Sequence, residues 1–425
     1  MSELREPIVV REHEDSRPVR LSVDERDALQ RIAPAISVRP IAKSADLYSL
    51  NPGNLVGAIQ VGDLRFELQP KLAIRRLLFL LGYSLDAGHW RDHDFGFETE
   101  PDLFEAIVHG FCAGLERALR FGPLQGYRFE EESLQAIRGK IRFNDHIRTR
   151  FGLMPPIECA FDEFTEDIEI NRILKAAIVR LGEIRLRSRE SRRRLRMLLT
   201  HFANVSLVRF DPRTVPAIEF DRRTEHYRGP VELARLILRS RSVDARSGEV
   251  SSAAFLLNLA KVFEDFVVVA LEERLRGDEG ELVQHAKGQG LHLDAARALK
   301  LEPDLSWWTG SRCLFVGDVK YKRTKPASGV KHPDAYQLLA YTTATRRRRG
   351  LLVYAAGDDL EEGGSLAVGA HRIVEADKVI EVRALDLDVP PDQVLEQVDE
   401  LAAEVRRQRL DPIDESPPLA LAVLN

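Results

Sequence analysis

The stretch LEPDLSWWTGSRCLFVGDVKYKR (Leu301–Arg323) decides the fold of the C-terminal part of this chain of 425 residues. Strand-forming residues on both sides of a turn signal at Gly310 predict a β-hairpin. In its second strand Asp318 and Lys320 are two positions apart, so both side chains lie on the same face. We expect the hairpin to bring Asp304, which follows a proline at the start of the first strand, beside them.

Two carboxylates and a lysine at the end of a hairpin suit Mg²⁺-assisted cleavage of a phosphodiester. Hard oxygen ligands hold Mg²⁺, which orients and acidifies a water molecule. The lysine can stabilise the hydroxide or the charge that develops at phosphorus. The alternative is a surface hairpin with a cross-strand ion pair. Apolar Val316, Val319 and Tyr321 indicate a buried strand, where a charge is costly unless it pairs or binds metal.

Two further features lie near the hairpin in sequence. Gln337 and Tyr341, in DAYQLLAYTTAT, are four positions apart and share one face of a predicted helix. They either orient the site or form the polar rim of a helix that docks on the sheet. Glu264 lies in a long predicted helix, Ala253–Arg276, among apolar residues. It is either a third carboxylate near the metal or part of a solvent-facing charged stripe.

Hydrophobic periodicity divides the chain into three regions and a tail. Residues 1–100 are expected to be β-rich, and residues 101–250 to be mixed helical and β, with a strand segment at Ile137–Ile147. Residues 251–410 follow an α/β order. The remaining residues, 411–425, are expected to form a tail.

Composition limits the class of protein. Hydrophobic residues make up 44% of the chain, which permits a core and excludes wholesale disorder. The 62 Lys and Arg residues against 67 Asp and Glu give a net charge of −5, so DNA binding would need local patches. Three scattered cysteines do not suggest a disulfide framework or a cysteine zinc site. The charged N-terminus and the short apolar clusters predict a cytoplasmic protein without a membrane segment.

Two arginine clusters each allow two interpretations. Arg185–Arg196 holds seven arginines in twelve positions, which form either a solvated helix face or a face that contacts phosphates. Arg346–Arg349 ends the helix of Gln337 and Tyr341. These cations either stabilise the helix C-terminus or contact the DNA backbone near the cut.

The order of these motifs resembles the PD-(D/E)xK nuclease core, in particular the subset with a Q-x-x-x-Y helix. The McrC family has segments similar to four in this chain, PDLSWW, FVGDVKYKR, HPDAYQLLAYTTAT and RGLLVYAA. These proteins are the nuclease subunits of McrBC-type, 5-methylcytosine-specific restriction systems. The resemblance is strongest over residues 254–356 and weaker in Gly53–Leu72 and Glu158–Ile178.

The resemblance implies a role for each candidate residue. Mg²⁺, for which Mn²⁺ can substitute, would be the cofactor. The implied metal ligands are Asp304 and Asp318, the catalytic lysine is Lys320, the accessory acid is Glu264, and the residues that orient the site or the phosphate are Gln337 and Tyr341.

The resemblance also implies partners. In the family, the N-terminal portion engages a ring of the McrB AAA+ GTPase and stimulates its hydrolysis, and the partner recognises the methylated base. The chain has no G-x-x-x-x-G-K-[ST] motif, since Gly139-Lys140 follows no glycine-rich loop, so we expect no nucleotide bound by this chain. Breaking a duplex needs two cuts, which predicts self-association of the nuclease domains on methylated DNA.

Together these features predict an α+β multidomain protein. N-terminal β-rich and mixed α/β regions would precede a C-terminal PD-(D/E)xK, restriction-endonuclease-like α/β domain. The expected function is that of a Mg²⁺-dependent DNA endonuclease in an antiviral restriction complex. One alternative is a non-catalytic adaptor that activates an AAA+ ring. Another is a stand-alone RecB-like nuclease that cuts at free DNA ends without an NTPase.

Overall fold

The computed structural model describes residues 6–42, 44, 46–85, 102–151, 153, 155–239, 252–324, 330–356 and 367–411. The chain forms two compact units, so the polypeptide passes between them more than once. One unit comprises Met1–Gln69 and Arg91–Leu256, and the other Pro70–Trp90 and Leu257–Asn425. The region boundaries expected at residues 100 and 250, and all but the first residue of the expected tail, lie outside the described residues.

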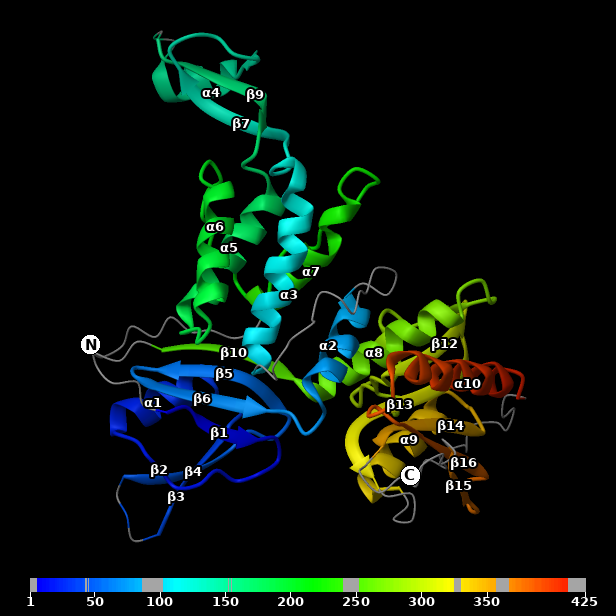
Figure 1. The fold of residues 1–425 in the computed structure, drawn as a ribbon. Coiled ribbons are helices and arrows are strands. Elements are labelled where there is room, and N and C mark those ends of the chain that lie inside the picture. The colour runs from blue at the N-terminus through cyan, green and yellow to red at the C-terminus, as the bar shows by residue number, and fades with distance from the viewer. Residues whose placement is uncertain are drawn as a thin grey trace, which may run out of the picture. The chain divides into compact units, whose positions relative to one another are not determined.

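The first unit contains a four-stranded sheet of order β1-β6-β5-β10 and a three-stranded sheet of order β2-β4-β3 (Figure 1). Together with helix α1, these sheets enclose an apolar core. Helix α1 begins at a capping box in which Ser22 and Glu25 satisfy each other's backbone amides. The elements are β1 (Ile8–Arg11), β2 (Val19–Arg20), α1 (Val23–Ile32), β3 (Ser37–Pro40), β4 (Leu47–Asn51), β5 (Leu55–Val61), β6 (Leu64–Gln69) and β10 (Ser252–Asn258).

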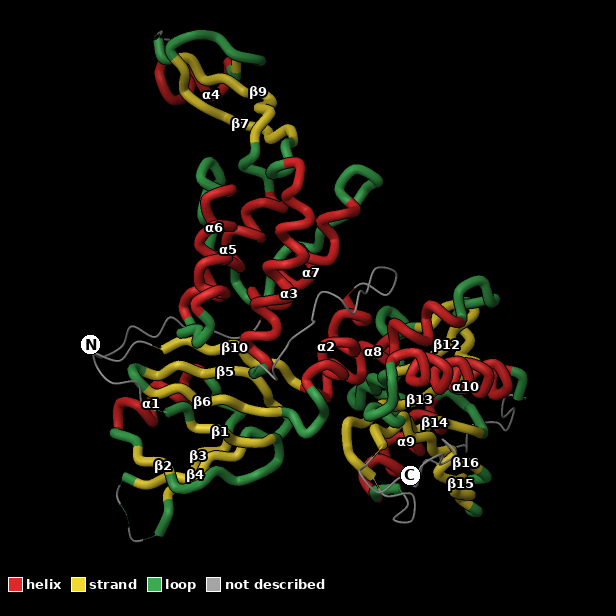
Figure 2. The backbone as a smooth tube through the Cα atoms, in the orientation of Figure 1, coloured by secondary structure: helices red, strands yellow, loops and turns green. Residues whose placement is uncertain are grey.

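Four helices of the first unit pack against one another (Figure 2). They are α3 (Leu103–Ala118), α5 (Glu169–Glu183), α6 (Arg189–His201) and α7 (Arg228–Arg239). Asp102 caps α3 through the amide of Glu105 at 2.9 Å and pairs with the buried Arg65 at 2.8 Å. One side chain therefore both starts the helix and fixes it to strand β6.

A smaller three-stranded sheet of order β7-β9-β8 continues from these helices (Figure 1). With helix α4 it forms what we call the β7–β9 module, residues 126–165. Its elements are β7 (Gly126–Leu134), β8 (Lys140–Ile141), α4 (Phe143–Arg150) and β9 (Ile157–Thr165). Of the strand expected over Ile137–Ile147, only Lys140–Ile141 is formed, as β8. The rest of that prediction is wrong, because the chain turns into helix α4.

The second unit is built on a six-stranded sheet of order β11-β12-β13-β14-β16-β15. The expected hairpin is confirmed: β12 pairs antiparallel with β13, and Gly310 takes the positive φ of +60° that the turn requires. β13 is parallel to β14, and β14 is parallel to β16. The strands are β11 (Glu281–Leu282), β12 (Leu305–Thr309), β13 (Arg312–Thr324), β14 (Arg349–Ala356), β15 (Ala367–Ile373) and β16 (Lys378–Leu385).

Helices cover both faces of this sheet (Figure 1). α9 (His332–Ala344) inserts Leu338 and Tyr341 among apolar residues of the central strands. α8 (Leu259–Arg274) and α10 (Pro391–Arg409) pack together against the sheet, and α2 (Ile74–Leu85) packs on α8. This is a layered α/β arrangement, and the expected mixed α+β class with several sheets is confirmed.

The expected helix over Ala253–Arg276 starts later than the sequence suggested. Residues 252–258 form strand β10 of the first unit, and the helix begins after Asn258, whose side chain accepts from the amide of Ala260 at 3.0 Å. An apolar run such as AAFLL fits a buried strand as well as a helix. Here pairing with β5 selects the strand.

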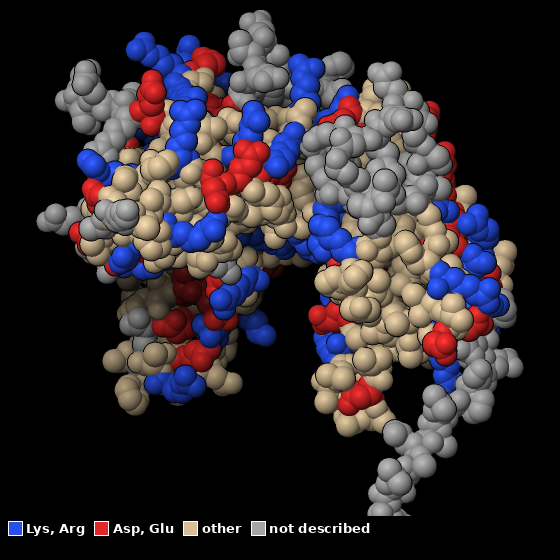
Figure 3. Space-filling model, turned by 90° about the horizontal axis from the view of Figure 1, so that it is seen from below, with Lys and Arg blue, Asp and Glu red and all other residues tan. Residues whose placement is uncertain are grey.

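The described surface mixes charges of both signs, and the face in Figure 3 carries interspersed basic and acidic side chains. This pattern agrees with the small net charge of −5. Among the described helices, none is both long enough and apolar enough to cross a membrane.

Candidate active site

The hairpin brings the three expected core residues together. The backbone amide of Val319 donates to Asp304 Oδ2 at 2.9 Å. Lys320 Nζ lies 2.5 Å from Asp318 Oδ2 and 4.0 Å from Asp304 Oδ2. The strand period that placed Asp318 and Lys320 on one face is therefore realised, and Asp304 completes the group.

Asp318 is the most deeply buried member, with a side chain that is 0% exposed. The ammonium of Lys320 pairs with Oδ2 of this carboxylate, and a second carboxylate, that of Asp304, lies close to the same ammonium. Burial, reinforced by the neighbouring charge of Asp304 and opposed by Lys320, raises the pKa of Asp318 to about 8. Two neighbouring carboxylates, one of them fully buried and only partly balanced by Lys320, are costly in a fold, so the cluster calls for a functional explanation.

Lys320 remains a cation in this setting. Burial alone would lower its pKa, but the carboxylates of Asp318 and Asp304 outweigh that effect and the pKa is raised. Its side chain is 20% exposed, so the ammonium lies between the buried carboxylate and solvent. It can therefore contact an anion that enters the site.

Glu264 lies close to Asp304, and His285 stands between them. His285 Nε2 is 3.3 Å from Glu264 Oε1, and His285 Nδ1 is 3.7 Å from Asp304 Oδ1. One ligand atom from each of the three residues falls within 4.8 Å of the others, as in a metal site. Glu264 also accepts from Gln284 and pairs with Lys261, each at 2.8 Å. Glu264 therefore lies near Asp304 and also pairs with a charged residue of its own helix, so both interpretations of its surroundings apply.

His285 was missed from the sequence. It lies in the short 3-10 segment Gln284–Ala286 and has a positive φ of 55°. Non-glycine residues in this backbone region are uncommon and concentrate at functional sites. A single histidine in VQHAKG carries no motif, so only the three-dimensional arrangement reveals it.

Gln337 and Tyr341 share a face of α9 as expected. Gln337 Nε2 donates to the Tyr341 hydroxyl at 2.7 Å, and that hydroxyl donates to the Glu302 carbonyl at 3.2 Å. Glu302 is two residues before Asp304. The pair therefore fixes the segment that delivers Asp304 to the site.

The arginines after α9 have mainly intramolecular partners. Arg347 is 1% exposed and donates to the carbonyls of Gln408 and Asp411. Arg349 pairs with Glu381, and Arg348 with Asp377. The interpretation of this cluster as DNA contacts is therefore weakened for these three residues.

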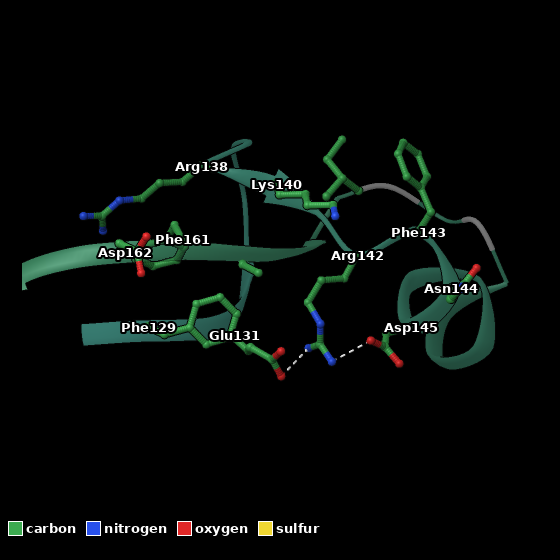
Figure 4. A pocket seen from close by; sticks show the side chains of 13 residues that line it. Phe129, Glu131, Arg138, Lys140, Arg142, Phe143, Asn144, Asp145, Phe161 and Asp162 are labelled. Carbon is green, nitrogen blue, oxygen red and sulfur yellow. Dashed lines mark ion pairs between the residues drawn. The ribbon is translucent and has the colours of Figure 1, made fainter. Parts of the chain in front are cut away.

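A groove lies outside this site, on the β7–β9 module (Figure 4). Its volume is about 940 Å³, and its lining mixes aromatic and charged side chains. Arg142 crosses it and pairs with Glu131 at 3.0 Å and with Asp145. Arg138 lies over the ring of Phe161 at 4.1 Å.

The family described as McrBC 5-methylcytosine restriction system component matches residues 50–355. The chain belongs to this family. The McrBC resemblance inferred from the sequence motifs is thereby confirmed. No match was found among curated proteins.

Two solved structures are similar to this McrBC protein. One is a chain of the refined half-complex from a tetradecameric assembly of Thermococcus gammatolerans McrB AAA+ hexamers with bound McrC. It aligns with a TM-score of 0.56 and 16% identity over 94% of this chain and 100% of that chain. The other belongs to the McrBC complex of the same organism, with a TM-score of 0.42, 19% identity, and coverage of 65% and 90%. The first similarity concerns the fold alone.

Proposed function

We propose that this McrBC family member is the nuclease subunit of its complex, a Mg²⁺-dependent endonuclease that cuts methylated DNA together with an McrB-like AAA+ GTPase ring. The observation that carries the proposal is Asp318, a fully buried carboxylate whose pairing with Lys320 is opposed by the neighbouring carboxylate of Asp304. Two neighbouring carboxylates that share one lysine leave negative charge that is costly to bury, and a bound divalent cation would neutralise it. The proposal includes a PD-(D/E)xK domain in the second unit.

The residues present fit a hard divalent cation. Asp304 and Asp318 supply oxygen donors of the kind that Mg²⁺ prefers, and His285 with Glu264 extends the donor set. A bound Mg²⁺ would supply charge neutralisation at the phosphate and a more acidic water molecule. An imidazole in the set is better suited to Mn²⁺ than to Mg²⁺, in agreement with the expected tolerance for Mn²⁺.

The chain's own residues divide the remaining tasks. The amide of Val319 orients Asp304 by its hydrogen bond. Lys320 offers a cation where negative charge develops at phosphorus. Gln337 and Tyr341 hold the backbone that precedes Asp304. Each task needs only positions that the hairpin and α9 already fix.

The β7–β9 module supports an interaction with the AAA+ partner. Eight of the eighteen exposed large hydrophobic side chains in the described part of the chain belong to it, including Phe129 at 63% and Phe151 at 89% exposure. Apolar surface of this density is typical of a protein–protein contact. We therefore propose this module, rather than residues 1–100 alone, as the contact with a ring such as the McrB hexamers of the similar structure.

A substitution at Asp318 tests the function. Asp318→Asn keeps the shape of the side chain and removes its charge, so cleavage of methylated plasmid with partner and GTP should be lost. Stimulation of the partner's GTPase should persist and would show that the complex still assembles. Cleavage at the wild-type rate would refute the nuclease proposal and favour the adaptor. Cleavage by the wild-type chain without partner, and only at DNA ends, would favour the stand-alone nuclease.

A further inference from the structure

Strand β13 carries a second lysine on the face of the candidate site. Lys322 follows Lys320 by two residues, and its contact with Asp334 of α9 places it on the side of the sheet that this helix covers. Side-chain exposure rises along this row from 0% at Asp318 to 20% at Lys320 and 38% at Lys322. The row therefore leads from the buried carboxylate out to solvent.

A buried carboxylate holds Lys322 in place. Its ammonium lies 2.6 Å from Asp334 Oδ1 and 2.9 Å from Asp334 Oδ2. The Asp334 side chain is 4% exposed and also accepts from the Tyr354 hydroxyl at 2.8 Å. Tyr354 belongs to β14 and Asp334 to the first turn of α9. The lysine is thus anchored by residues from two neighbouring elements.

The anchor does not cancel the positive character of this end of the site. The carboxylate of Asp334 lies at the N-terminus of a 13-residue helix, where the helix dipole offsets negative charge. Lys331, at the N-cap of the same helix, is exposed. An anion that approaches from solvent therefore meets cations first, and the buried carboxylate only behind them.

A purely structural role for Lys322 explains these contacts poorly. The hydrogen bond from Tyr354 already ties Asp334 to the sheet. The ammonium of Lys322 is more than a third exposed, so solvent screens its share of the ion pair. Fixing the ammonium has a larger consequence for binding, because a preorganised cation loses less entropy when it contacts a phosphate.

We propose that Lys322 binds a phosphate of the DNA backbone beside the scissile one, and that Asp334 is its positioning residue. This proposal rests on the proposed nuclease function and adds a substrate contact to it. Lys320 would face the phosphate that is cut, and Lys322 its neighbour on the same strand of DNA. The contact is to the backbone, so it carries no sequence preference.

The test measures DNA binding at several salt concentrations. The full chain, assembled with its partner, carries Asp318→Asn so that bound duplex is not cut. Lys322→Gln should weaken binding and lower the slope of log affinity against log salt by about 1. Lys322→Arg should retain both affinity and slope. Arg372→Gln is the matched control, since Arg372 is 70% exposed on β15, an edge strand of the same sheet.

Kinetics in the otherwise wild-type complex separate this inference from the proposed function. Lys322→Gln should raise KM several-fold more than it lowers kcat, and Lys322→Arg should restore KM. A slope and KM equal to those of Arg372→Gln, with or without a fall in thermal stability, would overturn the phosphate contact while cleavage stands. Unchanged cleavage by Asp318→Asn would instead overturn the nuclease function and, with it, this inference. Absence of salt-dependent DNA binding in the complex would also overturn the inference.

Discussion

Asp304 accepts a hydrogen bond at 2.9 Å from the backbone amide of Val319, the residue between Asp318 and Lys320. The carboxylate that precedes β12 is therefore oriented by the very strand that carries the other two site residues. Backbone amides move less than side chains, so the separation of the two carboxylates is set by the sheet. A metal site with such support is preorganised.

Removing Asp304 should abolish metal binding. Asp304→Ala deletes one donor and the acceptor of the Val319 amide, so calorimetric titration with Mn²⁺ should show no saturable binding. His285→Ala should lower Mn²⁺ affinity by about 10–100-fold, the range found when a supporting residue of a metal site is lost. The exposed Glu400 on α10 provides the control, Glu400→Ala. Equal Mn²⁺ affinity in all four proteins would refute the site.

Neutralising Asp318 should stabilise the metal-free protein. Burial and the neighbouring carboxylate of Asp304 raise the pKa of Asp318 to about 8, so the charged form of this side chain is disfavoured in the metal-free fold. Asp318→Asn should therefore raise the thermal midpoint in EDTA, and added Mn²⁺ should stabilise only the wild type. A lower midpoint for the variant would mean that the charge is needed for folding.

Asp167 should make the first unit sensitive to acid. Hydrogen bonds from Arg172, Ser206 and Arg128 hold the pKa of this carboxyl far below its usual range. A depressed pKa adds stability above the unfolded pKa of about 3.9, and this stability is lost as the pH falls below that value. Asp167→Asn should cost on the order of 2 kcal/mol at pH 7. The difference from wild type in urea unfolding should shrink below about pH 4, whereas a constant difference would contradict this account.

Gly57 should not tolerate a side chain. Its φ is +133°, and a Cβ at this position would lie 2.1 Å from the carbonyl oxygen of Phe255 on β10. Gly57→Ala should destabilise the first unit by about 2–4 kcal/mol. Gly182 in helix α5 has open space around it, so Gly182→Ala should be neutral or stabilising by about 0.5–1 kcal/mol. Similar thermal midpoints for the two variants would contradict the close approach.

Phe151 tests the proposed partner contact. It is 89% exposed and has a left-handed backbone with φ 52°, a conformation that asparagine tolerates better than phenylalanine. Phe151→Asn should leave the thermal midpoint unchanged or higher and weaken association with the AAA+ partner, measured by light scattering. Val374→Asn, at a 76% exposed position of the second unit, serves as control. Retained association would exclude Phe151 from the contact.

Local periodicity was enough to predict which residues come together at the centre of the candidate site. The strand period placed Asp318 and Lys320 on one face, and the turn at Gly310 returned the chain so that Asp304 could join them. The helix period likewise brought Gln337 and Tyr341 together. All of these relations act within about forty residues of sequence, where pattern and turn chemistry are informative.

Relations set by tertiary packing were not predictable. His285 enters the group through an irregular backbone with positive φ, which no periodicity indicates. Residues 252–258 became a strand because β5 was available to pair with them. Arg347 was expected either to stabilise the C-terminus of its helix or to contact DNA, and it is enclosed by the end of α10. For residues 252–258 and for Arg347 the decisive partner lies far away in sequence.

Helix α2 has a consequence for how the protein is made. Its Tyr83 donates a hydrogen bond to Glu273, 190 positions later, and Phe79 packs against Phe266 with ring centroids 5.6 Å apart. At translation rates of about 5–20 residues per second, α2 leaves the ribosome roughly 10–40 s before the helix it packs on. During that interval its apolar face has no native partner. A gene fragment that starts near residue 251 would lack α2 and leave α8 without the helix that packs on it. The second unit therefore requires α2 as well as the C-terminal part of the chain.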